Sequence, residues 1–233
     1  MADAVILDNV QLSSGIFRMT VRSESGGLPG QFYMLRAWST SPLLSRPISI
    51  FDIEGDQLHF LYQTAGEGTR LLSQLRAGDR IGLEGPFGNG FPAASGKIAL
   101  AGGGIGIAPL YYALKHLPQA EVYLGFSREP YLVAEFERLS SRVTVDIGGY
   151  ITDQIDLTAY DQVWVCGPEP MMKAMQRKNE AAGAAGKVFV SLENRMACGI
   201  GACLVCSTKT SGGRRKACAD GPVFPVEEVV FGG

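Results

Sequence analysis

The sequence predicts an antiparallel β-barrel followed by a parallel α/β domain and a small cysteine-rich segment at the C-terminus. Three observations predict this architecture. Short apolar runs separated by turn residues fill residues 1–92, strand and helix patterns alternate over residues 93–191, and four cysteines are crowded into residues 192–233. Many short strands indicate a barrel, and alternating strands and helices indicate a parallel sheet. We therefore expect domains at 1–92, 93–191 and 192–233.

The barrel half is predicted from six apolar runs and the turns between them. Strands are expected over residues 4–7, 16–21, 32–36, 47–53, 58–63 and 80–83. Turn signals such as Glu54-Gly-Asp56 and Ala77-Gly-Asp79 separate them, at the spacing typical of a small antiparallel barrel. One short helix is expected over residues 68–75, because its leucines at 71, 72 and 75 share one face.

The second half alternates between strand and helix patterns. Strands are expected over residues 98–101, 122–126, 143–147, 163–166 and 188–191, and helices over 107–117, 132–139 and 170–182. This order predicts a parallel sheet with helices on both faces. The Pro- and Gly-rich segment 86–92 is the expected junction between the halves.

Composition and charge exclude several classes of protein. The net charge is −2, so nothing indicates a basic surface for nucleic acid, and 46% hydrophobic residues indicate a folded chain. The N-terminus lacks a basic and apolar leader. The most apolar stretch, 98–114, contains four glycines and Pro109 and is short for a membrane span. We expect a cytoplasmic protein that binds neither nucleic acid nor membrane.

The four C-terminal cysteines have the spacing Cys198-x4-Cys203-x2-Cys206-x11-Cys218. Three crowded thiols and a distant fourth are typical of a plant-type [2Fe–2S] cluster. Gly199 and Gly201 allow the loop to adopt positive φ and bring N–H groups near the sulfurs. Structural zinc and disulfides are the alternatives, but zinc sites usually show two separated cysteine pairs, and disulfide frameworks belong to small secreted domains.

A glycine-rich turn lies between a predicted strand and helix of the α/β half. It contains Gly102, Gly103, Gly104 and Gly106 and ends at Pro109. Glycines at this place let the backbone approach the pyrophosphate of a dinucleotide, although tight packing also uses them. Cys166, followed by Gly167 and Pro168, ends a later strand and should face the same crevice. A buried, inert thiol is an equally good interpretation of Cys166.

The barrel half contains a second candidate phosphate site. Arg46-Pro-Ile-Ser49 begins a strand, and Arg46 offers a fork of N–H donors suited to phosphate. The segment Thr64-Ala-Gly-Glu-Gly-Thr69 precedes the short helix, where Gly68 and Thr69 can present N–H groups and a hydroxyl. The alternative for the first motif is an ordinary strand start with a surface arginine.

Taken in order, these motifs resemble the ferredoxin-NADP reductase superfamily. The cluster segment narrows the resemblance to the electron-transfer subunits of class 1B dihydroorotate dehydrogenases, and the likeness covers essentially the whole chain. It implies an FAD-binding barrel, a Rossmann-like NAD-binding domain and a [2Fe–2S] segment. The implied FAD contacts are Arg46, Pro47, Ile48, Ser49, Leu61, Tyr62, Gln63, Gly68 and Thr69, with Arg46 at the pyrophosphate and Ser49 near the flavin ring.

The resemblance also implies the remaining site residues. Gly102, Gly103, Gly104 and Gly106 would hold NAD phosphates, and Cys166, Gly167 and Pro168 would border the nicotinamide. Cys198, Cys203, Cys206 and Cys218 would ligate the cluster. The residues alone leave NAD and NADP open, because Ser127-Arg128-Glu129 at the end of the second strand contains both charges.

The implied function is electron transfer in pyrimidine biosynthesis. Electrons would pass from the FMN of a partner catalytic subunit through [2Fe–2S] and FAD to NAD⁺, within a heterotetramer. FAD is expected between the nucleotide crevice and the cluster. Alternatives of the same class are reductase subunits of an oxygenase, a sulfur reductase or a bifurcating NADH–ferredoxin:NADP complex. A redox sensor or a zinc-stabilised module is the alternative that is not an enzyme.

Overall fold

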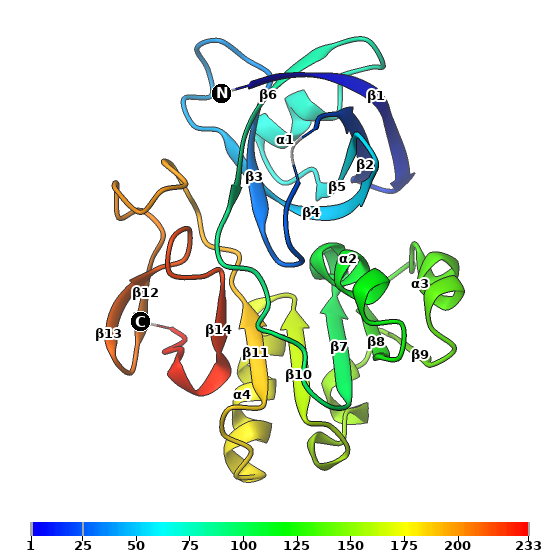
Figure 1. Ribbon diagram of the computed structural model, residues 1–233, viewed down its shortest axis with the longest axis vertical. Coiled ribbons are helices and arrows are strands. Elements are labelled where there is room, and N and C mark those ends of the chain that lie inside the picture. The colour runs from blue at the N-terminus through cyan, green and yellow to red at the C-terminus, as the bar shows by residue number, and fades with distance from the viewer. Residues whose placement is uncertain (1, 25, 233) are drawn as a thin grey trace.

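The computed structural model describes residues 2–24 and 26–232. Its barrel, its α/β sheet and its C-terminal segment adjoin one another near the middle of the molecule (Figure 1). The barrel lies at the top of the view and the α/β sheet below it, with α2 between them. The C-terminal segment, drawn in orange and red, runs along the side of both. The fold class predicted from the sequence is confirmed.

Six antiparallel strands close the barrel in the order β1-β2-β5-β4-β3-β6. Their bounds are β1 Ala2–Ser13, β2 Ile16–Arg22, β3 Phe32–Arg36, β4 Arg46–Glu54, β5 Gln57–Gln63 and β6 Arg80–Phe87. All six predicted strands are present, but β1 is much longer than its apolar run. It pairs with β6 at its start and with β2 along the rest, so pairing with both neighbours extends it beyond its apolar run.

The barrel helix α1 covers Glu67–Leu72 and ends three residues before its predicted end. Asn9 on β1 explains this early end, because its Nδ2 donates to the carbonyls of Leu72 and Leu75 at 2.9 Å each. The Asn9 side chain therefore donates to carbonyl groups that would bond within the helix if α1 were longer. Leu72 is buried in the barrel core, as the predicted apolar face requires.

The second half is a six-stranded sheet in the order β14-β11-β10-β7-β8-β9. Its strands are β7 Ile98–Gly103, β8 Glu121–Phe126, β9 Val143–Ile147, β10 Gln162–Cys166, β11 Val188–Ser191 and β14 Val223–Pro225. The helices are α2 Ala108–His116, α3 Val133–Leu139 and α4 Glu169–Ala181, and a 3-10 turn at Gly104–Ile107 precedes α2. None of the helices among the described residues is long and apolar enough to cross a membrane.

The strands β7 to β11 are parallel as predicted, but β14 is an antiparallel edge strand that the sequence pattern did not reveal. It comes from the C-terminal segment and pairs with β11, where Val190 lies opposite Phe224. Phe224 is buried in the core of the α/β domain. The same segment forms a hairpin of β12 Ser207–Thr210 and β13 Gly213–Lys216 around a polar turn. The segment 192–233 therefore covers one edge of the sheet.

Helix α2 joins the two halves by packing on β4 of the barrel. The rings of Phe51 and Tyr111 stack with centroids 4.5 Å apart. Next to them, Lys115 Nζ lies 2.8 Å from Asp52 Oδ2 and 3.0 Å from Glu54 Oε1. Asp52 is almost fully buried, and burial raises the pKa of its carboxyl although Lys115 opposes the rise. Lys115 therefore compensates a charge at the domain interface.

We expect Lys115→Met to lower the free energy of unfolding by about 1–3 kcal/mol at pH 7, because it leaves a buried carboxylate without its partner. The deficit should shrink as the pH falls through the raised folded pKa of Asp52, since the protonated carboxyl no longer needs a cation. Urea unfolding at pH 7 and at acidic pH measures both effects. Arg138→Met, which removes an exposed pair with Glu135, is the control and should cost less than about 1 kcal/mol. An equal deficit at both pH values would contradict the assignment.

Candidate functional site

A cavity of about 270 Å³ lies where the barrel meets the sheet, and it contains the residues expected beside a flavin ring. Two adjacent barrel strands, β4 and β5, supply one wall. Six of the seven expected residues of these strands line it, namely Pro47, Ile48, Ser49, Leu61, Tyr62 and Gln63, whereas Arg46 at the start of β4 does not. Because the chain folds β4 and β5 next to each other, two separate sequence segments form one continuous surface.

Tyr62 gives this wall a neutral, ordered aromatic ring. Its hydroxyl donates to Asn9 Oδ1 at 2.9 Å, and its ring stacks on Phe17 with centroids 5.7 Å apart. Burial raises the pKa of Tyr62, so the phenol keeps its proton over the physiological range. The wall therefore offers apolar and neutral groups to a planar ring system.

Arg46 and Gly68, predicted from separate motifs, lie against each other at the start of α1. A Cβ on Gly68 would lie 2.3 Å from Arg46 Nε, so only glycine lets the guanidinium pack there. Arg46 also lies over the ring of Trp38, 5.3 Å from its centroid, and donates to the carbonyl of Leu44. The hydroxyl of Thr69 is used within its own loop, where it accepts from Ala65 N and Gly66 N. A cation beside the first-turn N–H groups fits a phosphate.

A larger crevice of about 910 Å³ adjoins the flavin-type cavity at the carboxyl ends of the parallel strands. Gly103, Gly104 and Pro168 of the predicted nucleotide site line it. Gly102 and Gly106 instead allow close packing, since a Cβ on Gly106 would lie 2.3 Å from the carbonyl oxygen of Cys166. The glycine turn thus both opens the crevice and seats the 3-10 turn against β10.

Cys166 and Gly167 are buried beside this crevice, and of the three predicted residues here only Pro168 lines it. Its Sγ lies 3.9 Å from Glu193 Oε1. Burial raises the pKa of the Cys166 thiol, and the nearby carboxylate of Glu193 adds to this effect. The pKa of the Glu193 carboxyl is raised as well, because neighbouring protein atoms desolvate it, although the residue is exposed where it lines the crevice. Cys166 is therefore a neutral thiol next to the site.

The four C-terminal cysteines come together as two pairs. Cys206 Sγ and Cys218 Sγ are 3.2 Å apart, and Cys203 N donates to Cys198 Sγ at 3.4 Å. All four carry free thiols. Within residues 2–24 and 26–232, no set of three or more acidic, His or Cys side chains is placed around one metal ion. Two pairs of thiols fit a two-iron cluster, in which each iron takes two protein ligands.

The loop that carries these thiols has the backbone that the glycines predicted. Gly199 and Gly201 have φ of +73° and +79°. Gly201 N donates to Cys218 Sγ at 3.1 Å, and Cys218 N donates to Cys206 Sγ at 3.4 Å. N–H donors of this kind stabilise thiolates and tune a cluster that they surround. The residues present therefore fit an iron–sulfur group.

The structure adds site residues that the sequence analysis missed. Among the further residues that line the flavin-type cavity are Phe32, Glu193, Asn194, Met196 and Pro222. Glu193 and Asn194 follow the carboxyl end of β11. The rule that ligands lie at the carboxyl ends of parallel strands, which located Cys166, therefore applied to them as well. Phe32, Met196 and Pro222 carry no such local signal, because only the packing of distant segments brings them to the cavity.

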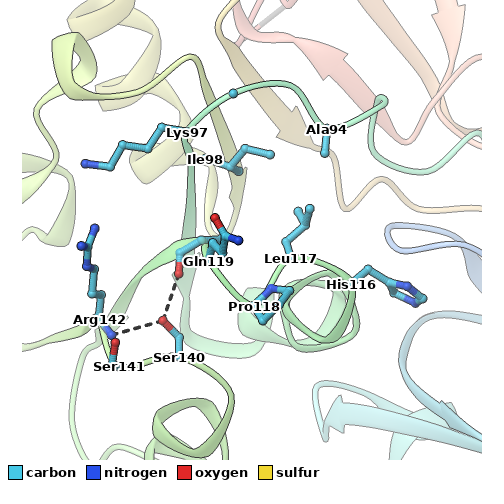
Figure 2. A pocket seen from close by; sticks show the side chains of 12 residues that line it. Ala94, Lys97, Ile98, His116, Leu117, Pro118, Gln119, Ser140, Ser141 and Arg142 are labelled. Atoms are coloured by element: carbon cyan, nitrogen blue, oxygen red, sulfur yellow. Dashed lines mark hydrogen bonds between the residues drawn. The ribbon is translucent and has the colours of Figure 1, made fainter.

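A separate pocket of about 730 Å³ lies at the opposite, amino ends of the strands (Figure 2). Lys97 and Arg142 are drawn on one side of it, but both are already paired with Glu121 Oε1, at 2.9 and 2.7 Å. The pKa of Glu121 is lowered to about 2. The hydrogen bond from Tyr160 is the largest cause, and the hydrogen bond from Lys97 is the next. Both cations share this one carboxylate, and none of the predicted nucleotide-site residues lines the pocket, so a nucleotide phosphate is not placed here.

Comparison with known families identifies the C-terminal segment. A family model described as the iron-sulfur cluster binding domain of dihydroorotate dehydrogenase B matches residues 193–230. Among curated proteins, the dihydroorotate dehydrogenase B (NAD(+)) electron transfer subunit of Clostridium acetobutylicum is 43% identical, over 97% of this chain and 96% of its own. The same subunit of Caldanaerobacter subterraneus subsp. tengcongensis is 40% identical over 98% of both.

Solved structures agree on the fold. The structure of an NADH-dependent reduced ferredoxin-NADP oxidoreductase superposes with a TM-score of 0.87 at 30% identity, over 99% of this chain and 91% of that chain. The ferredoxin reductase of carbazole 1,9a-dioxygenase superposes with a TM-score of 0.66 at 20% identity, over 78% and 65%. The second likeness concerns the fold alone, and it leaves out much of the present chain.

Proposed function

The chain belongs to the family of dihydroorotate dehydrogenase B electron transfer subunits, and on this premise we propose that it carries electrons between a dihydroorotate-oxidising partner and NAD⁺. Its cofactors are FAD, NAD and an iron–sulfur cluster, which we assign as [2Fe–2S]. We propose that the chain acts in pyrimidine biosynthesis, the pathway to which dihydroorotate belongs.

The observation that carries this proposal is the continuity of the three candidate sites. The flavin-type cavity and the nucleotide crevice have Gln63, Ile105 and Glu193 in common. On its other side, the cavity shares Phe32 and Met196 with the buried core around Cys206 and Cys218. This arrangement supports a flavin between the nicotinamide and the cluster.

Each group of residues has a proposed task. A bound flavin exchanges two electrons with a nicotinamide and single electrons with an iron–sulfur cluster, and that chemistry belongs to the cofactor. Arg46 and Gly68 hold the FAD pyrophosphate, and Pro47, Ile48, Ser49, Leu61, Tyr62, Gln63 and Thr69 complete its site. Gly102, Gly103, Gly104 and Gly106 shape the NAD site, whose nicotinamide end is bordered by Cys166, Gly167 and Pro168. Cys198, Cys203, Cys206 and Cys218 hold the cluster.

No acid or base is required of these residues. Hydride transfer between two bound rings needs alignment, and rigid walls supply it. The stacked pair of Phe51 and Tyr111 and the ion pairs of Lys115 hold the barrel and the sheet in one relative position. The domain interface therefore serves the alignment of the two rings.

An electron transfer subunit works with a catalytic partner. We propose that this partner contains FMN and that two copies of each chain form a heterotetramer. The proposed docking face is the loop around Cys203, where Ile200, Leu204 and Val205 are 66%, 62% and 53% exposed. Cys203 itself is exposed. Apolar side chains grouped beside a redox ligand favour a protein contact that shortens the path for electrons.

Purification of the tagged chain from its native cell tests the function. We expect a yellow-brown complex that contains an FMN-bearing subunit and reduces NAD⁺ with dihydroorotate. Ile200→Glu should release the partner while keeping flavin and iron, because a charge in an apolar contact is costly. Val10→Glu on β1, also at an exposed apolar position, is the matched control and should keep the partner.

The outcomes of this purification separate the alternatives. A colourless chain without flavin and iron would contradict the proposal and favour a sensor or a zinc module. Recovery of a ferredoxin-dependent NADP-reducing partner would instead favour a subunit like that of the similar NADH-dependent reduced ferredoxin-NADP oxidoreductase. Retention of the partner by Ile200→Glu would move the docking face elsewhere.

A further inference from the structure

We propose that Asn194 is a positioning residue that links the flavin-type cavity to Cys206 and Cys218, the inner pair of cluster cysteines. The inference rests on the proposed function and concerns how this chain holds the cluster relative to the flavin. Asn194 has three relevant features. It lines the cavity, it follows β11 of the sheet, and it is hydrogen-bonded to a cluster ligand.

The hydrogen bonds of Asn194 cross from the sheet to the cluster segment. Its Nδ2 donates to the carbonyl oxygen of Cys206 at 3.1 Å and to Thr208 Oγ1 at 2.6 Å. Both N–H bonds of the amide are thus used on two residues of the returning chain. The carbonyl oxygen of Cys206 can only accept, so a carboxylate or an aliphatic group at position 194 could not make this bond.

Cys206 belongs to the buried pair of thiols. Cys206 and Cys218 are 1% and 2% exposed, whereas Cys203 of the other pair is exposed to solvent. The buried pair packs in one core with Phe32 and Met196, and both of these residues also line the cavity. The cluster site therefore has an inner side towards the cavity and an outer side towards the docking face.

Asn194 is the side chain that connects this inner side with the cavity wall through a hydrogen bond. Met196 contributes packing to the same wall, but a flexible thioether fixes no orientation. Residues that orient metal ligands tune the affinity and the electronic properties of the site, although they do not touch the metal. We infer that Asn194 sets the orientation of the Cys206 backbone, and hence of its thiolate.

Three variants test this role. Asn194→Leu removes both hydrogen bonds at similar size, and Asn194→Asp removes the donors while keeping the shape. Thr208→Val is the matched control, because it removes only the acceptor at Thr208 and leaves the bond to Cys206. The measurements are flavin and iron content, the electron paramagnetic resonance spectrum of the reduced cluster, and stopped-flow rates of flavin and cluster reduction by NADH.

We expect both Asn194 variants to retain bound flavin. Because Asn194 lines the flavin-type cavity, cluster reduction is compared with flavin reduction within each of these variants. Their cluster should be reduced at least about tenfold more slowly, with a changed resonance spectrum or a lower iron content, as for other residues that orient metal ligands. Thr208→Val should resemble the wild type in both cluster readouts.

Two outcomes would overturn the inference. One is an unchanged resonance spectrum and cluster reduction rate in both Asn194 variants. The other is an equal loss of iron in Thr208→Val, which would show that the hairpin as a whole holds the cluster. A failure of the proposed function looks different, since the wild-type chain itself would then lack flavin or cluster.

Discussion

Cys203→Ser is expected to abolish the iron–sulfur absorbance of the protein and its electron transfer to the partner, while NADH still reduces a two-electron dye. Cys203 is the outermost of the four predicted ligands, and it does not belong to any buried core of the described residues. Serine at this position therefore removes one thiolate without creating a cavity. The barrel, the sheet and both nucleotide sites should remain folded.

The separation of the two activities follows from the order of the sites. The flavin-type cavity meets the nucleotide crevice through Gln63, Ile105 and Glu193, and none of these contacts involves the cysteine loop. Visible absorption, iron analysis and dye reduction by NADH measure the outcome. Cys166→Ser, the same chemical change outside the group, should keep the cluster bands. Loss of dye reduction with FAD still bound would show that the proposed order of the centres is wrong.

Arg46→Ala is expected to weaken FAD binding by roughly 10- to 100-fold, the effect of losing charged hydrogen bonds of about 1.5–3 kcal/mol. The guanidinium lies against Gly68 at the start of α1, where first-turn N–H groups add to its field. Alanine leaves those N–H groups but removes the cation. Arg46→Lys should recover only part of the affinity, because an ammonium cannot make the paired contacts of a guanidinium.

Titration of the flavin-free protein with FAD, followed by flavin fluorescence, measures this affinity. Arg22→Ala is the matched control, since Arg22 is exposed and pairs loosely with Asp56 at 3.5 Å. It should leave the affinity unchanged within about twofold, as expected for a surface ion pair. An Arg46→Ala protein that binds FAD like the wild type would remove Arg46 from the pyrophosphate site.

Much of the fold could be predicted from local patterns. The strands β9 and β11 begin and end at the predicted residues, because apolar runs of β-branched residues bounded by polar turns have few alternatives. The length of β1 and the end of α1 could not be predicted in this way. Both depend on partners outside the segment itself, β2 and β6 in one case and Asn9 in the other.

The same distinction between local patterns and distant partners applies to the residues of the candidate site. Gly199 and Gly201 were identifiable because a positive φ favours glycine at the residue itself, and Gly68 because it begins a predicted helix. The spacing of the four cysteines was equally informative, since neighbouring ligands in one loop depend on that loop alone. Glu193 and Asn194 were missed although they follow a parallel strand, because nothing local distinguishes their polar side chains from ordinary loop residues.

The sequence by itself determined the two architectures and the cysteine loop, and it indicated the candidate phosphate residues, because the signals for each come from residues close together in the chain. Only the tertiary structure decided that β14 returns to the sheet and that Phe32, Asn194 and Met196 form one wall between the cavity and the inner cysteines. Those contacts join segments more than a hundred residues apart in some cases, such as Phe32 and Met196. Their energy comes from burial shared between distant surfaces, which no local pattern of residues encodes.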